Sequence, residues 1–258
     1  VILAFLIFPC LIQRMSFLSA VIRLWRQWRP TVRIESLALL VSVFFSLACN
    51  GLFWKSSFAG RDFSQTDAWV FAAGLFVVIT AIHFLVLCLL LNRWTAKPML
   101  AVLIVATAFA VFYMGSFTVF LDPSMLRNVL RTDVKEASEL FSVSMLPHML
   151  FYVVLPVLVL TRLRLRRDGW RRAALIRAGS FVLASVLGAG AMLAIFQDLA
   201  PLMRNNKEIR YLITPGNYLY SLARVLGSDA SAATRERIKI GLDAVQAERW
   251  KKREKPAL

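Results

Sequence analysis

Five apolar blocks separated by short polar segments constrain this chain more than any other feature of its sequence. Each block is long enough to cross a hydrocarbon core of about 30 Å as a helix. Inside a bilayer the backbone N–H and C=O groups find no water, so a block of this length is stable there as a helix. We therefore expect an all-α fold, a polytopic five-span transmembrane helical bundle. The expected spans are Ser36–Trp54, Asp67–Asn92, Pro98–Leu121, Val143–Leu163 and Leu175–Gln197.

Composition agrees with a membrane protein. Hydrophobic residues make up 59% of the chain and the mean hydropathy is +0.64, whereas a soluble domain is about half apolar. The net charge is +16, from 31 Lys and Arg against 15 Asp and Glu, and in a soluble protein this would suggest nucleic acid as a partner. Here the positive residues flank the apolar blocks, so membrane orientation explains them better and no nucleic-acid partner is expected.

The distribution of positive charge predicts the orientation. Short loops rich in Lys and Arg stay on the cytoplasmic side, and an odd number of spans puts the two ends on opposite sides. With the N-terminus cytoplasmic and the C-terminus periplasmic, fourteen positive residues lie inside and five lie in the two outer loops. The fourteen are Arg14, Arg23, Arg26, Arg29, Arg33, Arg93, Lys97, Arg162, Arg164, Arg166, Arg167, Arg171, Arg172 and Arg177; the five are Lys55, Arg61, Arg127, Arg131 and Lys135.

The start of the chain allows two interpretations. Residues 1–14 are apolar but contain Pro9 and follow no basic region, so they fit a secretory signal poorly. One hypothesis is that Met15 is the initiator. The rival is a further span over residues 1–22, which would place Arg14 inside the membrane at a cost of at least about 3 kcal/mol.

The segments on either side of the spans are polar or amphipathic. Met15–Arg33 is basic and amphipathic, which predicts a helix on the cytoplasmic surface. After the last span we expect a turn at Pro215-Gly216, a helix over Asn217–Leu226 closed by Gly227, and a second helix over Ser231–Arg253. The turn and Gly227 are the expected hinges. The predicted division is therefore an N-terminal extension and interfacial helix (1–33), a five-span membrane domain (34–197) and periplasmic linking helices (198–258).

Chemistry-bearing groups are scarce. The cysteines Cys10, Cys49 and Cys88 lie in apolar segments without metal-ligand spacing, and we predict no catalytic, cofactor-binding or metal-binding residue in this chain. His83, near the middle of the second span, is expected to be a packed, hydrogen-bonded group more often than a proton relay, because no other ionisable group lies deep in a span. His148, near the outer end of the fourth span, is a weaker candidate for a role at the outer surface.

Three local signals concern helix geometry. Ser180, Ala184 and Gly188 share a four-residue spacing in the fifth span, which predicts close approach of a neighbouring helix. Pro156 should bend the fourth span. Asp122-Pro123 is typical of an N-cap followed by a first-turn proline.

The polar stretch Asp122–Leu140 lies between the third and fourth spans, on the predicted outer side. Asn128, Thr132 and Glu136 have i, i+4, i+8 spacing, which would align an amide, a hydroxyl and a carboxylate on one face of a helix. Such a face beside a membrane suits a polar lipid head group. The alternative is a solvated helix in which Asp133 and Glu136 form a capping box.

Two motifs in this chain resemble a known family. The pattern D-x-x-M-x-x-N-V-x-x-T-D-x-x-E-A, beginning at Asp122, looks like the membrane domain of the lipid A phosphoethanolamine transferases, which include the colistin-resistance enzymes. The segment R-N-N-K-E-I-R-Y-L-I-T-P-x-N-Y, Arg204 to Tyr218, resembles the part that follows the family's last span. The resemblance covers roughly residues 30–258. The chain departs from the family at Asn206, where His is common, and at Thr214, where Asn is frequent.

The resemblance implies an enzyme of the bacterial inner membrane that moves phosphoethanolamine from phosphatidylethanolamine to lipid A, a lipopolysaccharide modification that confers antibiotic resistance. In the family a threonine of a periplasmic domain attacks the donor phosphorus, and zinc activates it and stabilises phosphoryl charge. That domain follows a K-P-x-L stretch and reaches a G-E-T-A-R motif, whereas this chain ends at Lys255-Pro256-Ala257-Leu258. We therefore expect the chain alone to be inactive and to bind no zinc.

The resemblance also assigns Asn128, Thr132 and Glu136 to the binding of the ethanolamine head group. The implied partners are phosphatidylethanolamine, lipid A and membrane lipids. The alternatives are a non-catalytic lipid-binding or anchor module and, less favoured, a small transporter, for which His83 and Pro156 are the only mid-membrane candidates and no inverted repeat is visible.

Overall fold

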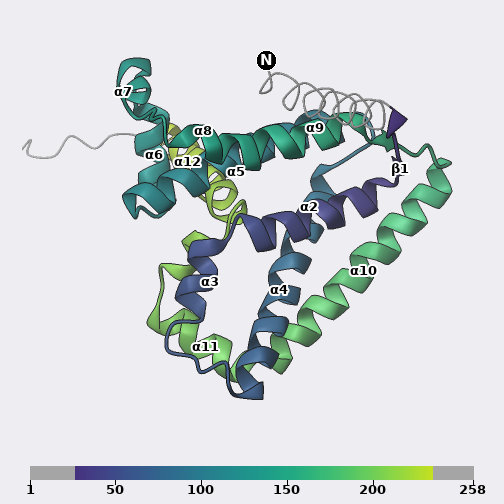
Figure 1. The fold of residues 1–258 in the computed structure, drawn as a ribbon, viewed down its shortest axis with the longest axis horizontal. Coiled ribbons are helices and arrows are strands. Elements are labelled where there is room, and N and C mark those ends of the chain that lie inside the picture. Colours follow the sequence, from purple (N-terminus) through teal and green to yellow (C-terminus); the bar gives the residue numbers. More distant parts are fainter. Residues whose placement is uncertain (1–26, 235–258) are drawn as a thin grey trace, which may run out of the picture.

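The computed structural model describes residues 27–234, and they form a helical bundle (Figure 1). Four helices are long and apolar enough to cross a membrane, or five if one bent helix pair counts as a single span. The expected all-α fold is confirmed, with two short strands in addition. The long single helices among these spans are α4 (Thr66–Leu90), α5 (Ala96–Phe117) and α10 (Trp170–Ala194).

The first span is broken. Helix α2 (Ile34–Ala48) and helix α3 (Gly51–Ser57) meet at an angle of 59°. The break lies at Asn50, whose side-chain Nδ2 donates to the Phe45 carbonyl at 2.8 Å. An asparagine side chain that bonds nearby backbone competes with the helical ladder, which explains a break inside an otherwise apolar block.

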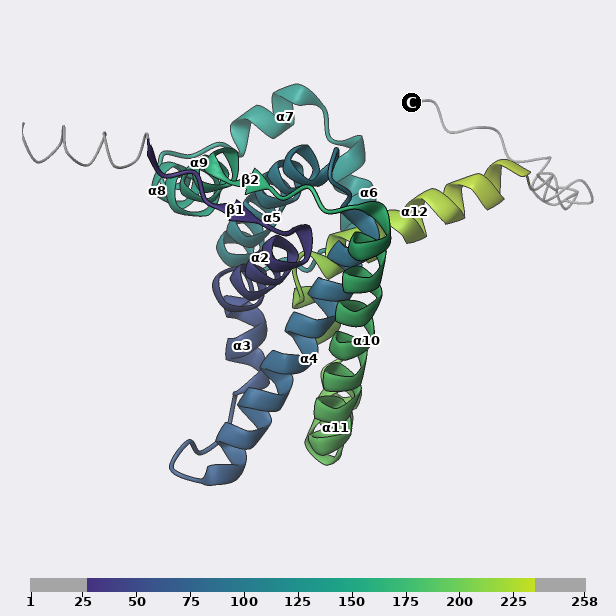
Figure 2. The same cartoon turned by 90° about the vertical axis from the view of Figure 1, so that its right-hand side faces the viewer.

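Helix α4 is the centre of the bundle, because it packs against α2 on one side and α10 on the other (Figure 2). Gly188 of α10 lies so close to α4 that a Cβ atom at this position would be 2.9 Å from the Cβ of Ala81. A residue without a side chain therefore lets the two backbones approach, and the packing role expected for Gly188 is confirmed.

The fourth span, Met145–Arg162, changes its helical geometry midway. It consists of α8 (Met145–Met149), a π-helical turn η1 (Leu150–Val154) and α9 (Leu155–Arg162). The proline that we expected to bend this span, Pro156, lies in the first turn of α9, directly after the π turn. Proline has no N–H to donate and its ring crowds the preceding turn, so a wider turn at this point accommodates it.

Two buried apolar clusters fill the bundle. One joins α2, the C-terminal half of α4, α5 and α9, with Phe45 and Leu100 fully buried. The other joins α3, the N-terminal half of α4 and the end of α5 to the segments after the last span, through Ile195, Ile209 and Leu212. The chain beyond the last span is thus part of the core and not a peripheral linker.

The strands β1 (Thr31–Val32) and β2 (Arg164–Leu165) pair in parallel at one end of the bundle. The interfacial helix expected over Met15–Arg33 falls mostly outside the described residues, and within them residues 28–33 are not helical and residues 31–32 form a strand. Pro30 explains this correction, since proline disfavours helix at and before its position. The extended backbone is held by hydrogen bonds from Arg164 and Arg166 N–H to the carbonyls of Pro30 and Val32, each 2.9 Å.

The segment after α10 forms α11 (Phe196–Asn205), a 3₁₀ turn η2 (Ile209–Leu212) and α12 (Gly216–Thr234). Helix α12 continues through Gly227, so the expectation that this glycine ends a helix at Leu226 is wrong. Glycine can end a helix when it adopts a positive φ, but nothing obliges it to do so, and here residue 228 is also held against α6. Apart from its first four residues, the helix expected over Ser231–Arg253 lies outside the described part of the chain.

Candidate functional site

The polar stretch between the third and fourth spans forms two short helices, α6 (Pro123–Arg131) and α7 (Val134–Glu139), at one end of the bundle (Figure 1). Asp122 caps α6, because its Oδ1 accepts a hydrogen bond from Met125 N–H at 2.8 Å. Pro123 follows in the first turn, where its missing N–H leaves no bond unmade. The N-cap and first-turn proline expected at this position are confirmed.

The single helix face expected for Asn128, Thr132 and Glu136 is wrong, because the helix breaks between the second and third of these residues. Thr132 has ψ of 129° and Asp133 has ψ of 167°, so both have extended backbone. The Asp133 carboxylate accepts a hydrogen bond from Glu136 N–H at 2.9 Å and thereby starts α7. This N-cap competes with continuation of α6.

The structure brings two of the three residues together. The Thr132 hydroxyl donates to the Asn128 carbonyl at 2.9 Å, and Thr132 is half-buried while Asn128 is exposed. Glu136 is exposed on α7, and within residues 27–234 its carboxylate contacts neither of them. The Thr132 hydroxyl proton is engaged by the Asn128 carbonyl, so the hydroxyl oxygen can only accept hydrogen bonds from a ligand. A cationic group such as an ammonium, which only donates, suits this position. The carbonyl end of α6 adds partial negative charge beside it.

Positive side chains accompany these acceptors. Arg131 ends α6 and Lys135 lies in the first turn of α7, and both are exposed. The surface formed by residues 128–136, which we call the α6–α7 surface, therefore presents the carboxylates of Asp133 and Glu136, neutral acceptors and two cations. A zwitterionic head group needs both signs of charge on its binding surface.

Helix α12 packs against α6 beside the α6–α7 surface. The Ser221 hydroxyl donates to the Leu121 carbonyl at 2.8 Å, and Ser221 is fully buried. Within α6, Arg127 Nη2 donates to the Ser228 hydroxyl at 2.8 Å. These contacts join residues about a hundred positions apart, and α12 continues away from the bundle past α6 (Figure 2).

The segment that leads into α12, residues 211–218, is docked into the bundle by buried polar groups. Asn50, at the break between α2 and α3, donates from Nδ2 to the Thr214 carbonyl at 2.8 Å and accepts from Thr214 N–H at 2.7 Å. Both residues are 1% exposed or less. The Asn50–Thr214 pair involves only the backbone of Thr214. The Thr214 hydroxyl donates to the Leu212 carbonyl at 3.3 Å instead. The departure from the family at Thr214 therefore leaves this reciprocal pair intact.

Two further residues of the docked segment bind α5 and the η2 turn. Asn217 Nδ2 donates to the Tyr211 carbonyl at 2.8 Å. The Tyr218 hydroxyl lies 3.1 Å from the Thr107 hydroxyl of α5, and burial raises the pKa of Tyr218 to about 12. Our sequence analysis treated these residues as part of a linking segment. The missed signal is three uncharged hydrogen-bonding side chains close together, Thr214, Asn217 and Tyr218, which suit a buried position better than a solvated linker.

Neither histidine belongs to the α6–α7 surface. His83 is 2% exposed and its Nδ1 lies 3.1 Å from the Ser46 hydroxyl, so it is the packed, hydrogen-bonded group that the sequence favoured. His148 Nε2 lies 2.9 Å from the Ala108 carbonyl of α5, and its ring stacks on Tyr152. The contact with Ala108 ties the fourth span to the third, whereas the stack on Tyr152 lies within the fourth span. The role at the outer surface considered for His148 gains no support from this geometry.

Residues 79–230 match the family described as Phosphoethanolamine transferase EptA/EptB. This range includes the α6–α7 surface, α12 and the docked segment. The chain belongs to this family.

Two relatives are identical to this chain at about a quarter of the aligned positions. The phosphoethanolamine transferase EptA of Escherichia coli K12 is 26% identical over 190 residues, which cover 73% of this chain and 35% of EptA. The phosphatidylethanolamine transferase Mcr-1 of Escherichia coli is 25% identical over 223 residues, 85% of this chain and 41% of Mcr-1. The chain thus spans well under half the length of the curated relatives that it matches.

One solved structure shares the fold. The integral membrane protein lipooligosaccharide phosphoethanolamine transferase A (EptA) from Neisseria meningitidis superposes with a TM-score of 0.72 at 23% identity. The superposition covers 81% of this chain and 38% of that protein. The likeness agrees with a multi-pass membrane domain built of helices.

The described residues do not fit the zinc site that the resemblance implies for the family. Among residues 27–234 no three His, Cys, Asp or Glu side chains come together in a group that could hold a metal ion. A zinc site in a protein needs three or four such ligands around one point. We therefore derive no chemical step through zinc for this part of the chain.

Proposed function

We propose that this membrane domain belongs to an enzyme that moves phosphoethanolamine from phosphatidylethanolamine to lipid A, and that the α6–α7 surface holds the ethanolamine head group of the donor. The observation that carries the proposal is the family match over residues 79–230, because it includes this surface together with the α12 helix and the docked segment that support it. Two relatives from Escherichia coli, the phosphatidylethanolamine transferases Mcr-1 and Mcr-2, agree with this proposal by name.

The chemistry of the head group suits the groups that the surface offers. An ammonium group pairs best with a carboxylate and neutral oxygen acceptors, which Glu136, the Thr132 hydroxyl and the Asn128 side chain supply. Arg131 and Lys135 are placed to attract the phosphate of the same head group. Since Glu136 lies on the second helix, the head group would bridge α6 and α7 instead of lying along one helix.

The proposal includes an orientation and a division of labour. The N-terminus is cytoplasmic and the C-terminus periplasmic in the bacterial inner membrane, with an extension over residues 1–33, the membrane domain over 34–197 and the linking helices over 198–258. A nucleophilic threonine and zinc belong to a catalytic domain outside these residues. The membrane domain anchors that domain and binds lipid, and residues 1–258 alone have no transferase activity.

The test uses the full-length enzyme with Glu136→Gln, which removes the charge and keeps the shape. Loss of a charge-assisted hydrogen bond to the ammonium should raise KM for phosphatidylethanolamine about tenfold and change kcat less. Glu139→Gln is the matched control, because Glu139 is also exposed on α7 and the charge change is the same. Equal KM values for wild type and Glu136→Gln would remove Glu136 from the site.

A second experiment tests the division of labour. Residues 1–258 are produced in cells that lack any endogenous transferase, and lipid A is examined by mass spectrometry. We expect lipid A without added phosphoethanolamine, whereas the full-length enzyme adds it. Modified lipid A in cells with residues 1–258 alone would contradict the proposal that the reaction needs a separate catalytic domain.

A further inference from the structure

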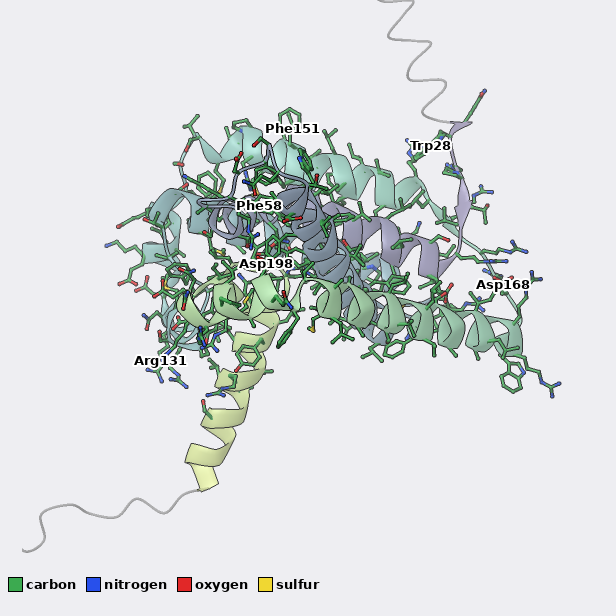
Figure 3. All side chains as sticks on the ribbon, turned by 90° about the horizontal axis from the view of Figure 1, so that it is seen from below. Trp28, Phe58, Arg131, Phe151, Asp168 and Asp198 are labelled. Carbon is green, nitrogen blue, oxygen red and sulfur yellow. The ribbon has the colours of Figure 1, made fainter. Side chains whose placement is uncertain are left out.

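A basic pocket lies at the end of the bundle opposite the α6–α7 surface. Its position is marked by Asp168, while Arg131 marks the other end (Figure 3). The cavity has a volume of about 370 Å³ and lies between the start of α2, the turn after α4, the chain around β2 and the start of α10. This volume is within the usual range for small-ligand pockets, about 300–1,000 Å³. Five arginines line it: Arg33, Arg93, Arg166, Arg167 and Arg177.

Two carboxylates in the pocket balance only part of this charge. Asp168 pairs with Arg33 at 3.5 Å and with Arg166 at 3.2 Å, and Glu35 pairs with Arg177 at 3.5 Å. Five arginines and two carboxylates leave a net formal charge of +3. The pocket is therefore positive even after its internal ion pairs are counted, which favours an anionic ligand.

Arg93, Arg167 and the backbone N–H groups at the starts of α2 and α10 also favour an anionic ligand. Arg93 and Arg167 are exposed and contact no carboxylate within residues 27–234. The pocket also contains the first turns of α2 and α10, and no side chain caps either helix. Free N–H groups at the start of a helix carry partial positive charge and bind phosphate oxygens.

An apolar groove continues from the pocket. It has a volume of about 320 Å³ and runs between α2, α4 and α10, and Glu35 lines both the pocket and the groove. Beyond Glu35 its walls are mainly hydrocarbon, with Leu39, Phe76 and Leu183 among them. Leu39 and Leu183 are 49% and 60% exposed, so the groove opens towards the surroundings of the bundle, which in a membrane are acyl chains.

We propose that the basic pocket and the apolar groove together bind one anionic diacyl phospholipid. Its phosphate lies among Arg93, Arg167 and the two helix starts, and one acyl chain lies along the groove. A phosphatidylethanolamine head group would place its ammonium among the arginines, so the pocket prefers a lipid with net negative charge. The site lies at the end predicted to be cytoplasmic and is separate from the donor site proposed for the α6–α7 surface.

The test measures lipid binding to the purified 258-residue chain in neutral detergent, by native mass spectrometry. The probes are dioleoyl phosphatidylglycerol and dioleoyl phosphatidylcholine, which differ in head-group charge but share their acyl chains. We expect at least about fivefold tighter binding of the phosphatidylglycerol. Arg93→Gln together with Arg167→Gln should weaken this binding about twenty-fivefold, or about fivefold per arginine. Arg171→Gln is the matched control, since Arg171 is exposed in the same first turn of α10 but does not line the pocket.

A second variant tests the groove without touching any charge. Ser180→Leu adds volume inside the groove, and it should weaken phosphatidylglycerol binding at least about threefold, since it displaces part of a buried acyl chain. Glycerol 3-phosphate, which has no acyl chain, serves as the soluble probe and should bind much more weakly than the lipid. Equal binding of the two lipids, unchanged binding in the double arginine variant, or equal binding of glycerol 3-phosphate and phosphatidylglycerol would each overturn the proposal.

Discussion

The two ends of the bundle are held together by different kinds of polar contact. At the end that carries the α6–α7 surface, Asn50, Ser221 and Tyr218 bind backbone or hydroxyl groups in places that are largely or fully buried. At the other end, Asp168 and Glu35 pair with arginines whose side chains are about a third to a half exposed. A buried hydrogen bond is costly to lose because the remaining partner finds no water, whereas an exposed ion pair contributes about 0–1 kcal/mol.

The difference suggests different tasks for the two ends. Buried neutral contacts fix α12 and the docked segment, so the surface above them has one geometry. The ion pairs at the other end keep their arginines partly exposed. Arg93 and Arg167, which we propose to hold the phosphate, pair with no carboxylate among residues 27–234 and so have none to release. Four substitutions test this difference, three at polar contacts and one at the packing of α10 on α4.

The largest effect is expected for Asn50→Ala. Its side chain makes three hydrogen bonds to backbone groups of Phe45 and Thr214, and all lie in the buried interior. Removing it leaves those groups without partners, so the unfolding free energy in detergent should fall by about 3–5 kcal/mol. Asn206→Ala is the control, because Asn206 is exposed, and it should change stability by less than about 0.5 kcal/mol. A loss below about 1 kcal/mol for Asn50→Ala would show that the docked segment does not stabilise the bundle.

The next effect concerns the packing of α10 on α4. Gly188→Leu would drive a side chain into Ala81 and should cost about 1–3 kcal/mol of unfolding free energy. At Gly190, two residues further along the same helix, a Cβ atom meets no atom within 4 Å, so Gly190→Leu should leave stability unchanged or improve it by up to about 1 kcal/mol. Thermal unfolding of the two variants side by side gives the comparison, and equal unfolding temperatures would contradict the contact.

A smaller effect is expected for Tyr218→Phe, which removes the hydroxyl that faces Thr107 and keeps the ring. The loss of one buried hydrogen bond should lower the unfolding free energy by about 1 kcal/mol. Tyr220→Phe tests the same chemical change on an exposed ring of α12, 51% accessible, and should have no measurable effect. If both variants unfold like the wild type, the Tyr218 hydroxyl makes no net contribution.

The smallest effect is expected for Asp168→Asn at the basic end. Its two ion pairs, with Arg33 and Arg166, involve partly exposed arginines, so the loss should stay below about 1 kcal/mol at low salt. About 1 M NaCl should abolish the difference from wild type, since the Debye length falls to about 3 Å. The Asn50→Ala difference should not depend on salt. If Asp168→Asn lowered the unfolding free energy by several kcal/mol at every salt concentration, the polar contacts at the two ends would be of the same kind.

Much of the fold was predictable because it depends on local signals. Apolar blocks of membrane length predicted the spans to within a few residues, since a bilayer permits little besides helix at that length. Asp122-Pro123 predicted the start of α6, because a cap acts within three residues. The helix break at Thr132–Asp133 was misjudged although its cause is also local: the same Asp133 that was considered as a cap interrupts the face on which Asn128, Thr132 and Glu136 were expected to lie.

The remaining features depend on partners that are remote in the sequence. The bent first span and the docked segment exist because Asn50 and Thr214 meet across 164 positions, and the extended course of residues 31–32 is set by pairing with residues 164–165. No periodicity or propensity within either segment encodes those partners. The residues alone establish the membrane class, the number of apolar blocks and, through two motifs, the resemblance to the family. Only the tertiary structure decided which polar groups are buried together, because burial is a property of the packed bundle and not of any one stretch of chain.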